Sequence, residues 1–179
     1  MANLNANHKT IELINSSKNK EKIRVLFVCL GNICRSPAAE GVMRAVVERN
    51  DASDKWTIDS AGTGGWHVGD LPDKRMRVHA IRRGYDLTHI CRQVKSTDFD
   101  NFDIIIGMDD NNISDLKRLA PTVEDECKIV PMADFVDKAM RCHAIPDPYY
   151  EGAEGFELVL DLLESACENL FRQVNSDKA

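Results

Sequence analysis

Hydrophobic and polar positions along the chain follow two alternating patterns. Short, nearly continuous apolar runs are typical of strands buried on both faces. Such runs occur at residues 23–28, 56–60, 104–106 and 128–130. Between and after them, apolar residues recur at helical spacing. This spacing predicts helices over residues 37–49, 73–83, 110–119 and about 155–174.

The alternation of strands and helices predicts an α/β fold. It indicates a single open, parallel sheet of four strands with helices on both faces. The chain shows no Gly/Ser-rich linker and no internal repeat, so residues 23–176 are predicted to form one domain. In such folds, ligands bind beyond the carboxyl ends of the strands. Candidate chemistry is therefore expected directly after Val28, Ser60, Ile106 and Val130.

Residues 1–22 are predicted to be a disordered polar extension. They are rich in Asn, Lys and Glu, with only scattered Ile and Leu. They lack the unbroken apolar stretch that a secretory signal needs, and the second residue is not the Gly that myristoylation requires. Because free cysteines persist in the cytosol, we expect a cytoplasmic location.

The composition is that of an ordinary globular protein. Of the 179 residues, 43% are hydrophobic and 29% are charged, and the formal net charge is −6. This acidic balance argues against nucleic-acid binding through a bulk positive field. The chain has no run of 18 apolar residues, so no membrane insertion is expected. Its six cysteines are too sparse for a disulfide framework, which leaves each as a small buried hydrophobe or a reactive group.

The segment after the first strand carries the strongest candidate chemistry. It reads Cys29-Leu30-Gly31-Asn32-Ile33-Cys34-Arg35-Ser36-Pro37. Gly and Asn tolerate positive φ angles, so this loop can turn tightly and direct N–H groups inward at the start of a helix. Arg35 adds a planar guanidinium that fits two phosphoryl oxygens. The sequence therefore predicts a phosphate cradle that also stabilises a Cys29 thiolate, to which Ser36 can donate a hydrogen bond.

Two other interpretations of this loop are weaker. An ordinary strand–helix turn with a buried cysteine and a surface arginine would require several separate features to coincide by chance. Zinc binding by Cys29 and Cys34 lacks both the short Cys-x-x-Cys spacing and a nearby pair that completes four ligands. We therefore expect no metal and no cofactor here, because the loop amides and Arg35 supply the positive field.

In these residues the chain resembles the low-molecular-weight protein tyrosine phosphatases, over about residues 23–174. The resemblance rests on the loop and on further segments in the family's order, namely Asp59-Ser60-Ala61-Gly62-Thr63, Pro72-Asp73-Lys74-Arg75-Met76, His89, Arg92-Gln93, Asp98-Phe99, Met108-Asp109 and Asp147-Pro148-Tyr149-Tyr150. It implies a four-stranded parallel sheet in flavodoxin-like order, in agreement with the alternation of elements.

The resemblance also implies roles for single residues. Cys29 would be the nucleophile, Arg35 the phosphate clamp and Asp147 the general acid. The phosphate-binding loop would comprise Leu30, Gly31, Asn32, Ile33, Cys34 and Ser36. The residues expected to hold that loop in a hydrogen-bond network are Asn32, Ser60 and His89. The implied reaction is hydrolysis of phosphotyrosine, and of small aryl phosphates, through a phosphocysteine intermediate without a metal.

A proton donor can also be argued from the residues alone. Departure of a phenolate from an aryl phosphate needs a proton, and a positioned acid contributes about 10²–10⁴ in rate. Asp147 lies between two prolines, and Tyr149 and Tyr150 beside it offer flat walls for a substrate ring. An Asp before a Pro is otherwise a common turn former. Trp66 is the candidate for the opposite wall of the substrate site. The alternative interpretation is that Trp66 packs at the edge of the hydrophobic core.

Cys34 suggests that the site is sensitive to oxidation. Cys29 and Cys34 stand five residues apart in a curled loop, so their sulfurs can approach one another, and a thiolate is readily oxidised. We expect peroxide to inactivate the protein reversibly through a Cys29–Cys34 disulfide. The alternative is that Cys34 only packs in the core.

Other functions fit the residues less well than phosphotyrosine hydrolysis. Arsenate reduction on this fold uses two further cysteines, and only Cys91 lies in the relevant region. Phosphoarginine phosphatases of the family carry Thr where Ile33 stands and lack the tyrosine pair. A phosphotyrosine-binding module or a flavin carrier is disfavoured by the intact set of Cys29, Arg35 and Asp147. The expected partners are tyrosine-phosphorylated proteins, and we expect a monomer with weak self-association through exposed tyrosines.

Overall fold

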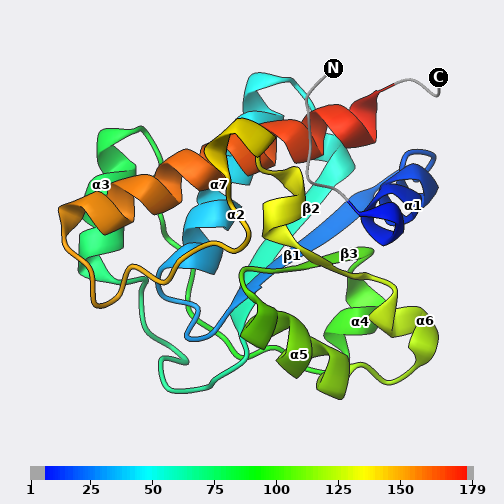
Figure 1. The fold of residues 1–179 in the computed structure, drawn as a ribbon, viewed down its shortest axis with the longest axis horizontal. Helices are drawn as coiled ribbons and strands as arrows, with labels where there is room; N and C mark the ends of the chain where they lie inside the picture. The colour runs from blue at the N-terminus through cyan, green and yellow to red at the C-terminus, as the bar shows by residue number, and fades with distance from the viewer. Residues whose placement is uncertain (1–6, 177–179) are drawn as a thin grey trace.

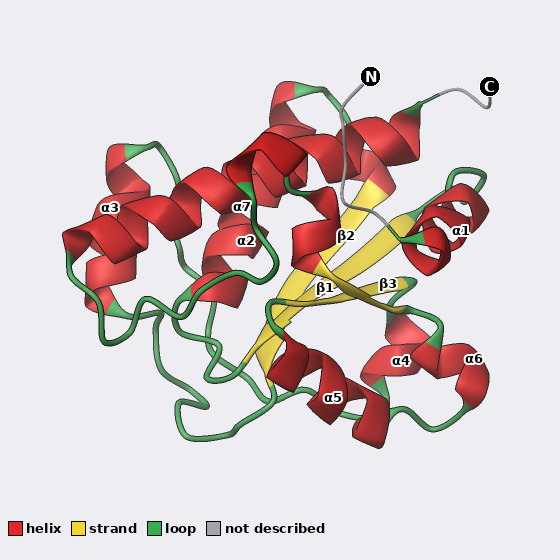
Figure 2. Ribbon diagram, viewed as in Figure 1, coloured by secondary structure: helices red, strands yellow, loops and turns green. Residues whose placement is uncertain are grey.

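A computed structural model of the chain describes residues 7–176. Its sheet consists of β1 (Ile23–Cys29), β2 (Trp56–Gly62), β3 (Ile104–Gly107) and β4 (Ile129–Pro131). All pairings are parallel, and the spatial order is β2-β1-β3-β4 (Figure 2). This is the doubly wound order of flavodoxin-like folds. The predicted α/β fold with a four-stranded parallel sheet is confirmed.

Helices connect and cover these strands. In the described region they are α1 (His8–Ser17), α2 (Arg35–Arg49), α3 (Lys74–Arg82), α4 (Asp98–Asn101), α5 (Asp110–Leu119), α6 (Val123–Glu126) and α7 (Ala153–Asn175), with short 3-10 turns at Ser53–Lys55, Met132–Phe135 and Lys138–Met140. Within residues 7–176, no helix is both long and apolar enough to span a membrane, α7 included.

The sheet lies between two layers of helices (Figure 1). On one face α2 and α7 pack together against the strands, with α3 beside α7, while α4 and α5 cover the other face. Side chains of β1 alternate between the two layers: Val25 and Phe27 belong to the larger core, and Leu26 and Val28 to the smaller one. All four are fully buried. Burial on both faces is why the run reads as continuously apolar in the sequence.

The register of the strands brings their carboxyl ends together. Along the pairing of β1 with β2, Ile23 is opposite Trp56 and Cys29 is opposite Gly62. On the other side of β1, Val28 is opposite Gly107 at the end of β3. The segments that follow these strands therefore emerge at one edge of the sheet, where ligands bind in this class of fold.

The N-terminal segment is not the disordered extension that its composition predicts. Residues 8–17 form α1, whose start is capped by the Asn7 side chain, which accepts from the Thr10 N–H at 3.0 Å. Ile14 is only 2% exposed and joins the larger core, and the buried Thr10 hydroxyl bonds Asp134. Tertiary packing of one helix face stabilises a sequence that is otherwise polar. Residues 1–6 of the predicted extension lie outside the described part of the chain.

Candidate active site

The turn between β1 and α2 forms the predicted loop. It begins at Cys29, and α2 begins at Arg35. Asn32 has a φ of 57°, a left-handed conformation that few residues other than Gly and Asn adopt readily. Gly62 lies against this turn, since a Cβ there would be 2.7 Å from the Leu30 carbonyl oxygen and 3.0 Å from the Asn32 nitrogen. A left-handed asparagine and a neighbouring strand without side-chain bulk together allow the tight turn.

The outer rim of the loop is held by neighbouring segments. The Asp73 N–H donates to the Ile33 carbonyl oxygen at 2.8 Å. Gly31 faces the His67 ring, because a Cβ on Gly31 would be 3.3 Å from His67 Cδ2. Leu30 is 43% exposed, which places an apolar side chain at the mouth of the site.

Cys29 is buried, and its sulfur has one hydroxyl neighbour. Ser36 Oγ lies 3.0 Å from Cys29 Sγ, in the first turn of α2. The Ser36 oxygen also accepts a hydrogen bond from Asn32 Nδ2 at 2.8 Å. Its own hydrogen is therefore free to point toward the sulfur or toward the Ala61 carbonyl oxygen at 3.3 Å. The hydroxyl is placed to donate to a Cys29 thiolate.

The Asn32 side chain joins the loop to two other segments. Its Nδ2 group donates to Ser60 Oγ at 3.0 Å as well as to Ser36. Its Oδ1 atom lies 2.9 Å from His89 Nε2 and accepts from the Arg92 N–H, also at 2.9 Å. The hydrogen bonds that the resemblance implied between Asn32, Ser60 and His89 are present. Because Oδ1 can only accept, His89 Nε2 is the donor in that contact.

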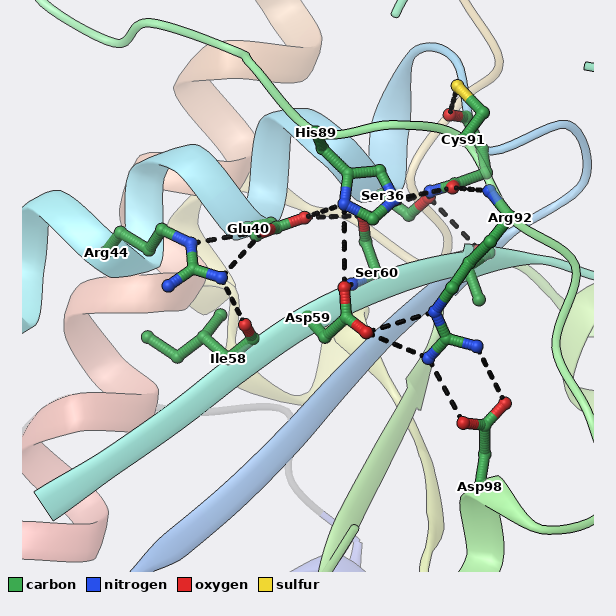
Figure 3. Close-up of polar contacts among 12 residues, drawn as sticks. Ser36, Glu40, Arg44, Ile58, Asp59, Ser60, His89, Cys91, Arg92 and Asp98 are labelled. Atoms are coloured by element: carbon green, nitrogen blue, oxygen red, sulfur yellow. Dashed lines mark hydrogen bonds and ion pairs between the residues drawn. The ribbon is translucent and has the colours of Figure 1, made fainter. Parts of the chain in front are cut away.

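Behind this network lies a layer of charged groups, shown in Figure 3. Ser60 Oγ donates to Glu40 Oε2 at 2.7 Å, and His89 Nδ1 lies 3.1 Å from the same oxygen. His89 Nδ1 is also 3.5 Å from Asp59 Oδ1. Arg92 pairs with Asp59 at 2.9 Å. The hydrogen bonds that support the phosphate loop thus connect it to buried or partly buried ion pairs and not to solvent.

Three of these side chains also have the spacing of a metal site. Single ligand atoms of Glu40, Asp59 and His89 lie within 4.8 Å of one another. Both carboxylates already pair with guanidinium groups, since Arg44 lies 2.9 Å from Glu40 and Arg92 lies 2.9 Å from Asp59. Two bound cations leave little negative potential for a third, so the cluster fits a supporting role better than metal binding.

Arg35 is buried, donates two hydrogen bonds and forms an ion pair with Asp147. Its NH1 group donates to Asp109 Oδ2 at 2.6 Å and to the Ile145 carbonyl oxygen at 3.0 Å, and NH2 lies 3.5 Å from Asp147 Oδ2. Burial acts to lower the pKa of Arg35, but the Cys29 sulfur and the carboxylates of Asp109 and Asp147 outweigh it and raise that pKa. The guanidinium is fixed in place with its positive charge.

Asp109 is the partner of Arg35 that sequence reasoning does not identify. It caps α5, where its side chain accepts from the Asn112 N–H at 2.8 Å while Asn112 Oδ1 accepts from the Asp109 N–H. It comes two residues after the end of β3. That position at the carboxyl edge of the sheet was the available signal for a site residue.

Asp147 lies at the entrance of the site, and its side chain is 44% exposed. Its Oδ1 atom accepts from the Tyr149 N–H at 3.1 Å, and its Oδ2 atom faces Arg35. The Tyr149 and Tyr150 rings meet edge to face with centroids 4.9 Å apart. Arg75 lies over the Tyr149 ring at 5.2 Å and donates to the Tyr149 carbonyl oxygen at 3.0 Å, which anchors this segment to α3.

The exposed aromatic side chains differ in how firmly they are held. Tyr150 is 93% exposed, whereas Tyr149 is 38% exposed beneath Arg75. Trp66 is 72% exposed, with its indole lying over Gly64, so it is a surface residue and does not belong to the core. The structure places Tyr149 beside Asp147 and shows Trp66 as an open aromatic surface on a different loop.

Two further thiols contact or belong to the loop. Cys34 is the buried N-cap residue of α2, and burial raises the pKa of its thiol, with the charge of Asp73 adding to the effect. Cys91 Sγ lies 2.8 Å from the Asn32 carbonyl oxygen, and burial raises the pKa of Cys91 to about 11. Both thiols therefore keep their protons at neutral pH. The anchoring of Asn32 by Cys91 was not predicted, since a lone cysteine carries no sequence signal of that role.

Comparison with known proteins places this geometry in a family. The family model described as "Low molecular weight phosphotyrosine protein phosphatase" matches residues 24–179. The chain is 44% identical over 152 residues to low molecular weight phosphotyrosine protein phosphatase 1 of Drosophila melanogaster, covering 84% of this chain and 96% of that protein.

Solved structures show the same likeness. A protein tyrosine phosphatase from Entamoeba histolytica matches with a TM-score of 0.81 and 47% identity, over 84% of this chain and 95% of that one. DARP, a Drosophila arginine phosphatase, matches with a TM-score of 0.80 and 33% identity, over 87% of this chain and all of that one (100%).

The fold and the loop with Cys29 and Arg35 define a cysteine-dependent protein phosphatase. The family match and the identity to the relatives carry the assignment further. The chain belongs to the low molecular weight phosphotyrosine protein phosphatases.

Proposed function

We propose that the protein hydrolyses phosphotyrosine through a phosphocysteine intermediate, with Cys29 as nucleophile, Arg35 as phosphate clamp and Asp147 as acid and base. The observation that carries this proposal is the convergence of the three groups. Cys29 and Arg35 lie on one tight loop, and Arg35 NH2 is 3.5 Å from the carboxylate of Asp147. A nucleophile, a fixed cation and a proton carrier thereby border the same space.

In the first step, the Cys29 thiolate attacks phosphorus in line with the tyrosyl oxygen. The S–P bond forms as the P–O bond to the tyrosine breaks, and protonated Asp147 gives its proton to the departing phenolate oxygen. Negative charge on the three equatorial oxygens faces Arg35 and the N–H groups of the loop. Because Asp109 and the Ile145 carbonyl hold the Arg35 side chain, its guanidinium need not reorganise during the reaction.

In the second step, water releases the phosphate. Asp147, now a carboxylate, takes a proton from a water molecule whose oxygen attacks phosphorus, and the S–P bond breaks. Inorganic phosphate leaves, the Cys29 thiolate is restored, and Asp147 is protonated for the next cycle. The Ser36 hydroxyl at 3.0 Å supports the thiolate at the start and the end of the cycle.

The walls of the entrance favour an aromatic substrate. Leu30 and Tyr149 present partly exposed apolar surface, and Tyr150 and Trp66 are largely exposed aromatic groups. A phenyl ring gains from such contacts. Phosphoarginine is a second candidate substrate because DARP, an arginine phosphatase, shares this fold at 33% identity. Ile33 and the tyrosine pair favour phosphotyrosine over it.

The central experiment compares substrates and variants without added metal. Wild-type protein is expected to hydrolyse p-nitrophenyl phosphate and phosphotyrosine, and phosphoserine and phosphoarginine much more slowly. Cys29→Ser should abolish turnover, whereas Cys127→Ser, which changes an exposed cysteine, should not. Turnover by Cys29→Ser at the wild-type rate would contradict the mechanism, and faster cleavage of phosphoarginine than of phosphotyrosine would favour the second candidate.

Asp147 has its own test. Asp147→Ala should slow p-nitrophenyl phosphate hydrolysis by about 10²-fold or more, and the loss should grow as the leaving group becomes a poorer one. Asp54→Ala is the matched control, because Asp54 is an exposed carboxylate just before β2, at the opposite end of that strand from the loop. A loss that does not depend on the leaving group would point to another proton donor.

We also propose that peroxide inactivates the protein reversibly. Peroxide would oxidise the Cys29 thiolate to a sulfenic acid, and the Cys34 sulfur would then displace water to form a disulfide, which an added thiol reduces. Cys34 belongs to the same loop and keeps its proton until it reacts. Peptide mapping after mild oxidation should find the Cys29–Cys34 disulfide, and recovery of activity by thiol should be lost in Cys34→Ala. Only irreversible acids at Cys29 in the wild type would contradict the proposal.

A further inference from the structure

The outer face of α3 combines cationic and aliphatic side chains. The inner side of this helix is formed by Met76 and Ala80, which are fully buried. At 100° per residue, the opposite side of the helix is centred on Val78. The residues of this outer face are Lys74, Val78, Ile81 and Arg82, which are exposed, and Arg77 at its flank, which is half-buried.

The cations of the outer face differ from the other cations of α3 in having no counter-charge. Arg75 pairs with Asp73 at 2.9 Å, and Arg83 pairs with Asp161 on α7 at 2.8 Å. Within residues 7–176, no carboxylate forms an ion pair with Lys74, Arg77 or Arg82. A chain with a net charge of −6 thus presents three unneutralised positive charges along one helix face.

Apolar surface lies between these charges. Val78 is 38% exposed and Ile81 is 54% exposed. Exposed aliphatic groups interleaved with free cations are suited to a partner that carries carboxylates on short aliphatic stems, as Glu and Asp do. The positive charge of the face disfavours a basic partner.

The outer face starts at the rim of the active site. Asp73, the N-cap residue of α3, donates to the Ile33 carbonyl oxygen of the phosphate loop at 2.8 Å. Arg75 in the first turn holds the Tyr149 carbonyl oxygen beside Asp147. Figure 1 shows α3 running beside the first turns of α7 at the outer edge of the molecule.

The length of the face defines the segment that it can bind. Lys74 and Arg82 are separated by about 12 Å along the axis, at about 1.5 Å per residue. An extended peptide advances about 3.3 Å per residue, so about four residues span this distance. A peptide whose phosphotyrosine occupies the loop can therefore lay its flanking residues along α3.

We propose that this face binds an acidic segment that flanks the phosphotyrosine of a protein substrate. This inference rests on the proposed phosphotyrosine hydrolysis and adds a substrate class to it. Phosphotyrosine sites with two or three Asp or Glu residues within about six positions are preferred over neutral or basic ones. This preference arises from charge complementarity, which raises the association rate of an acidic peptide. The preference should therefore weaken as salt is added.

The test uses three phosphotyrosine peptides of equal length, with Glu, Ala or Lys as the flanking residues. Wild-type protein should show the highest kcat/KM for the acidic peptide, and the advantage should shrink between 50 mM and 500 mM salt. The variant K74E/R77E/R82E should lower kcat/KM for the acidic peptide by about tenfold, the scale expected of three surface ion pairs. Turnover of p-nitrophenyl phosphate, which has no flanking residues, reports that the variant is folded.

The matched control is K55E/K117E/K138E, which makes the same change in net charge at exposed lysines on other parts of the surface. It should keep the wild-type ratio between the acidic and the neutral peptide. If both triple variants lose the ratio equally, bulk charge and not this face is responsible, and the proposal is overturned.

Other outcomes distinguish this proposal from the proposed phosphatase activity itself and from membrane binding. A wild-type protein that cleaves all three peptides equally well overturns the docking face but leaves phosphotyrosine hydrolysis standing. A wild-type protein that cleaves none of the peptides and no p-nitrophenyl phosphate overturns the proposed function and this inference with it. Equal peptide cleavage, together with K74E/R77E/R82E-sensitive sedimentation on phosphatidylserine vesicles, would assign the face to a membrane surface instead.

Discussion

Replacing Asn32 tests whether the phosphate loop is held by its side-chain network. Asn32→Ala removes the four hydrogen bonds to Ser36, Ser60, His89 and the Arg92 N–H. Each bond contributes about 1 kcal/mol net, and buried partners are left without Asn32. A left-handed conformation costs alanine about 1 kcal/mol more. The free energy of unfolding should therefore fall by about 3–5 kcal/mol.

A second substitution separates the two parts of this loss. Asn32→Gly also removes the hydrogen bonds but adopts the φ of 57° without strain. It should therefore recover about 1 kcal/mol relative to Asn32→Ala, and not the whole loss. Asn50→Ala is the matched control, because Asn50 is exposed and its side-chain Nδ2 donates one hydrogen bond, of 2.8 Å, to the Val46 carbonyl oxygen. That variant should change the stability by no more than about 1 kcal/mol.

Urea unfolding followed by circular dichroism measures these losses, and p-nitrophenyl phosphate turnover measures the effect on the site. Misplacement of the loop by about 1 Å should lower kcat by about 10²-fold in both Asn32 variants. An Asn32→Ala variant that loses less than about 1 kcal/mol and keeps its kcat would refute the network argument. Full recovery of stability and kcat by Asn32→Gly would show that backbone strain alone matters at this position.

Two further predictions concern the edge of the sheet opposite the active site. Burial acts to raise the pKa of Asp103, but hydrogen bonds from Arg24 and Lys20 lower it from 3.8 to about 2. Ionised Asp103 therefore stabilises the fold above about pH 4, and this stabilisation is lost as the pH falls toward 2. Asp103→Asn should cost about 2 kcal/mol in urea unfolding at pH 7, and a gap from wild type that stays constant down to pH 2 would contradict the linkage. Ile14→Ala should cost about 2–3 kcal/mol and lower Tm by about 5–10 °C, while Ile11→Ala, at a position 46% exposed on the same helix, should leave Tm nearly unchanged; equal losses would show that α1 is not packed through Ile14.

The sheet and most of the helices could be predicted from the sequence because their signals are local. Apolar runs marked β1 and β3, and helical spacing with Pro121 as a stop predicted residues 110–119, the bounds that α5 has. The helix after the phosphate loop was predicted from Pro37, but α2 begins at Arg35 because the loop already turns into the helix at Cys34.

What the sequence does not reveal depends on distant contacts. α1 was missed because its polar sequence gains stability from Asp134, which bonds Thr10 across 124 positions. The pairing of Arg35 with Asp109 joins residues 74 positions apart. Two partners of the Asn32 side chain, Ser60 and His89, lie 28 and 57 positions away, and only the family resemblance indicated them. Local patterns reveal the loop, whereas the residues that hold it in place come together only in the folded structure.

The way in which the phosphate loop is held has a consequence for the product of the reaction. The turn is fixed by contacts with the rest of the protein: Asn32 bonds Ser60, Ser60 bonds Glu40, and Gly62 packs against the turn. A tetrahedral anion entering this loop therefore need not order it first, which removes one of the usual costs of binding. In the proposed mechanism, released inorganic phosphate binds to the same preformed loop as the substrate. We therefore expect inorganic phosphate to inhibit the protein as a product, and we expect its thermal stability to rise with the phosphate concentration.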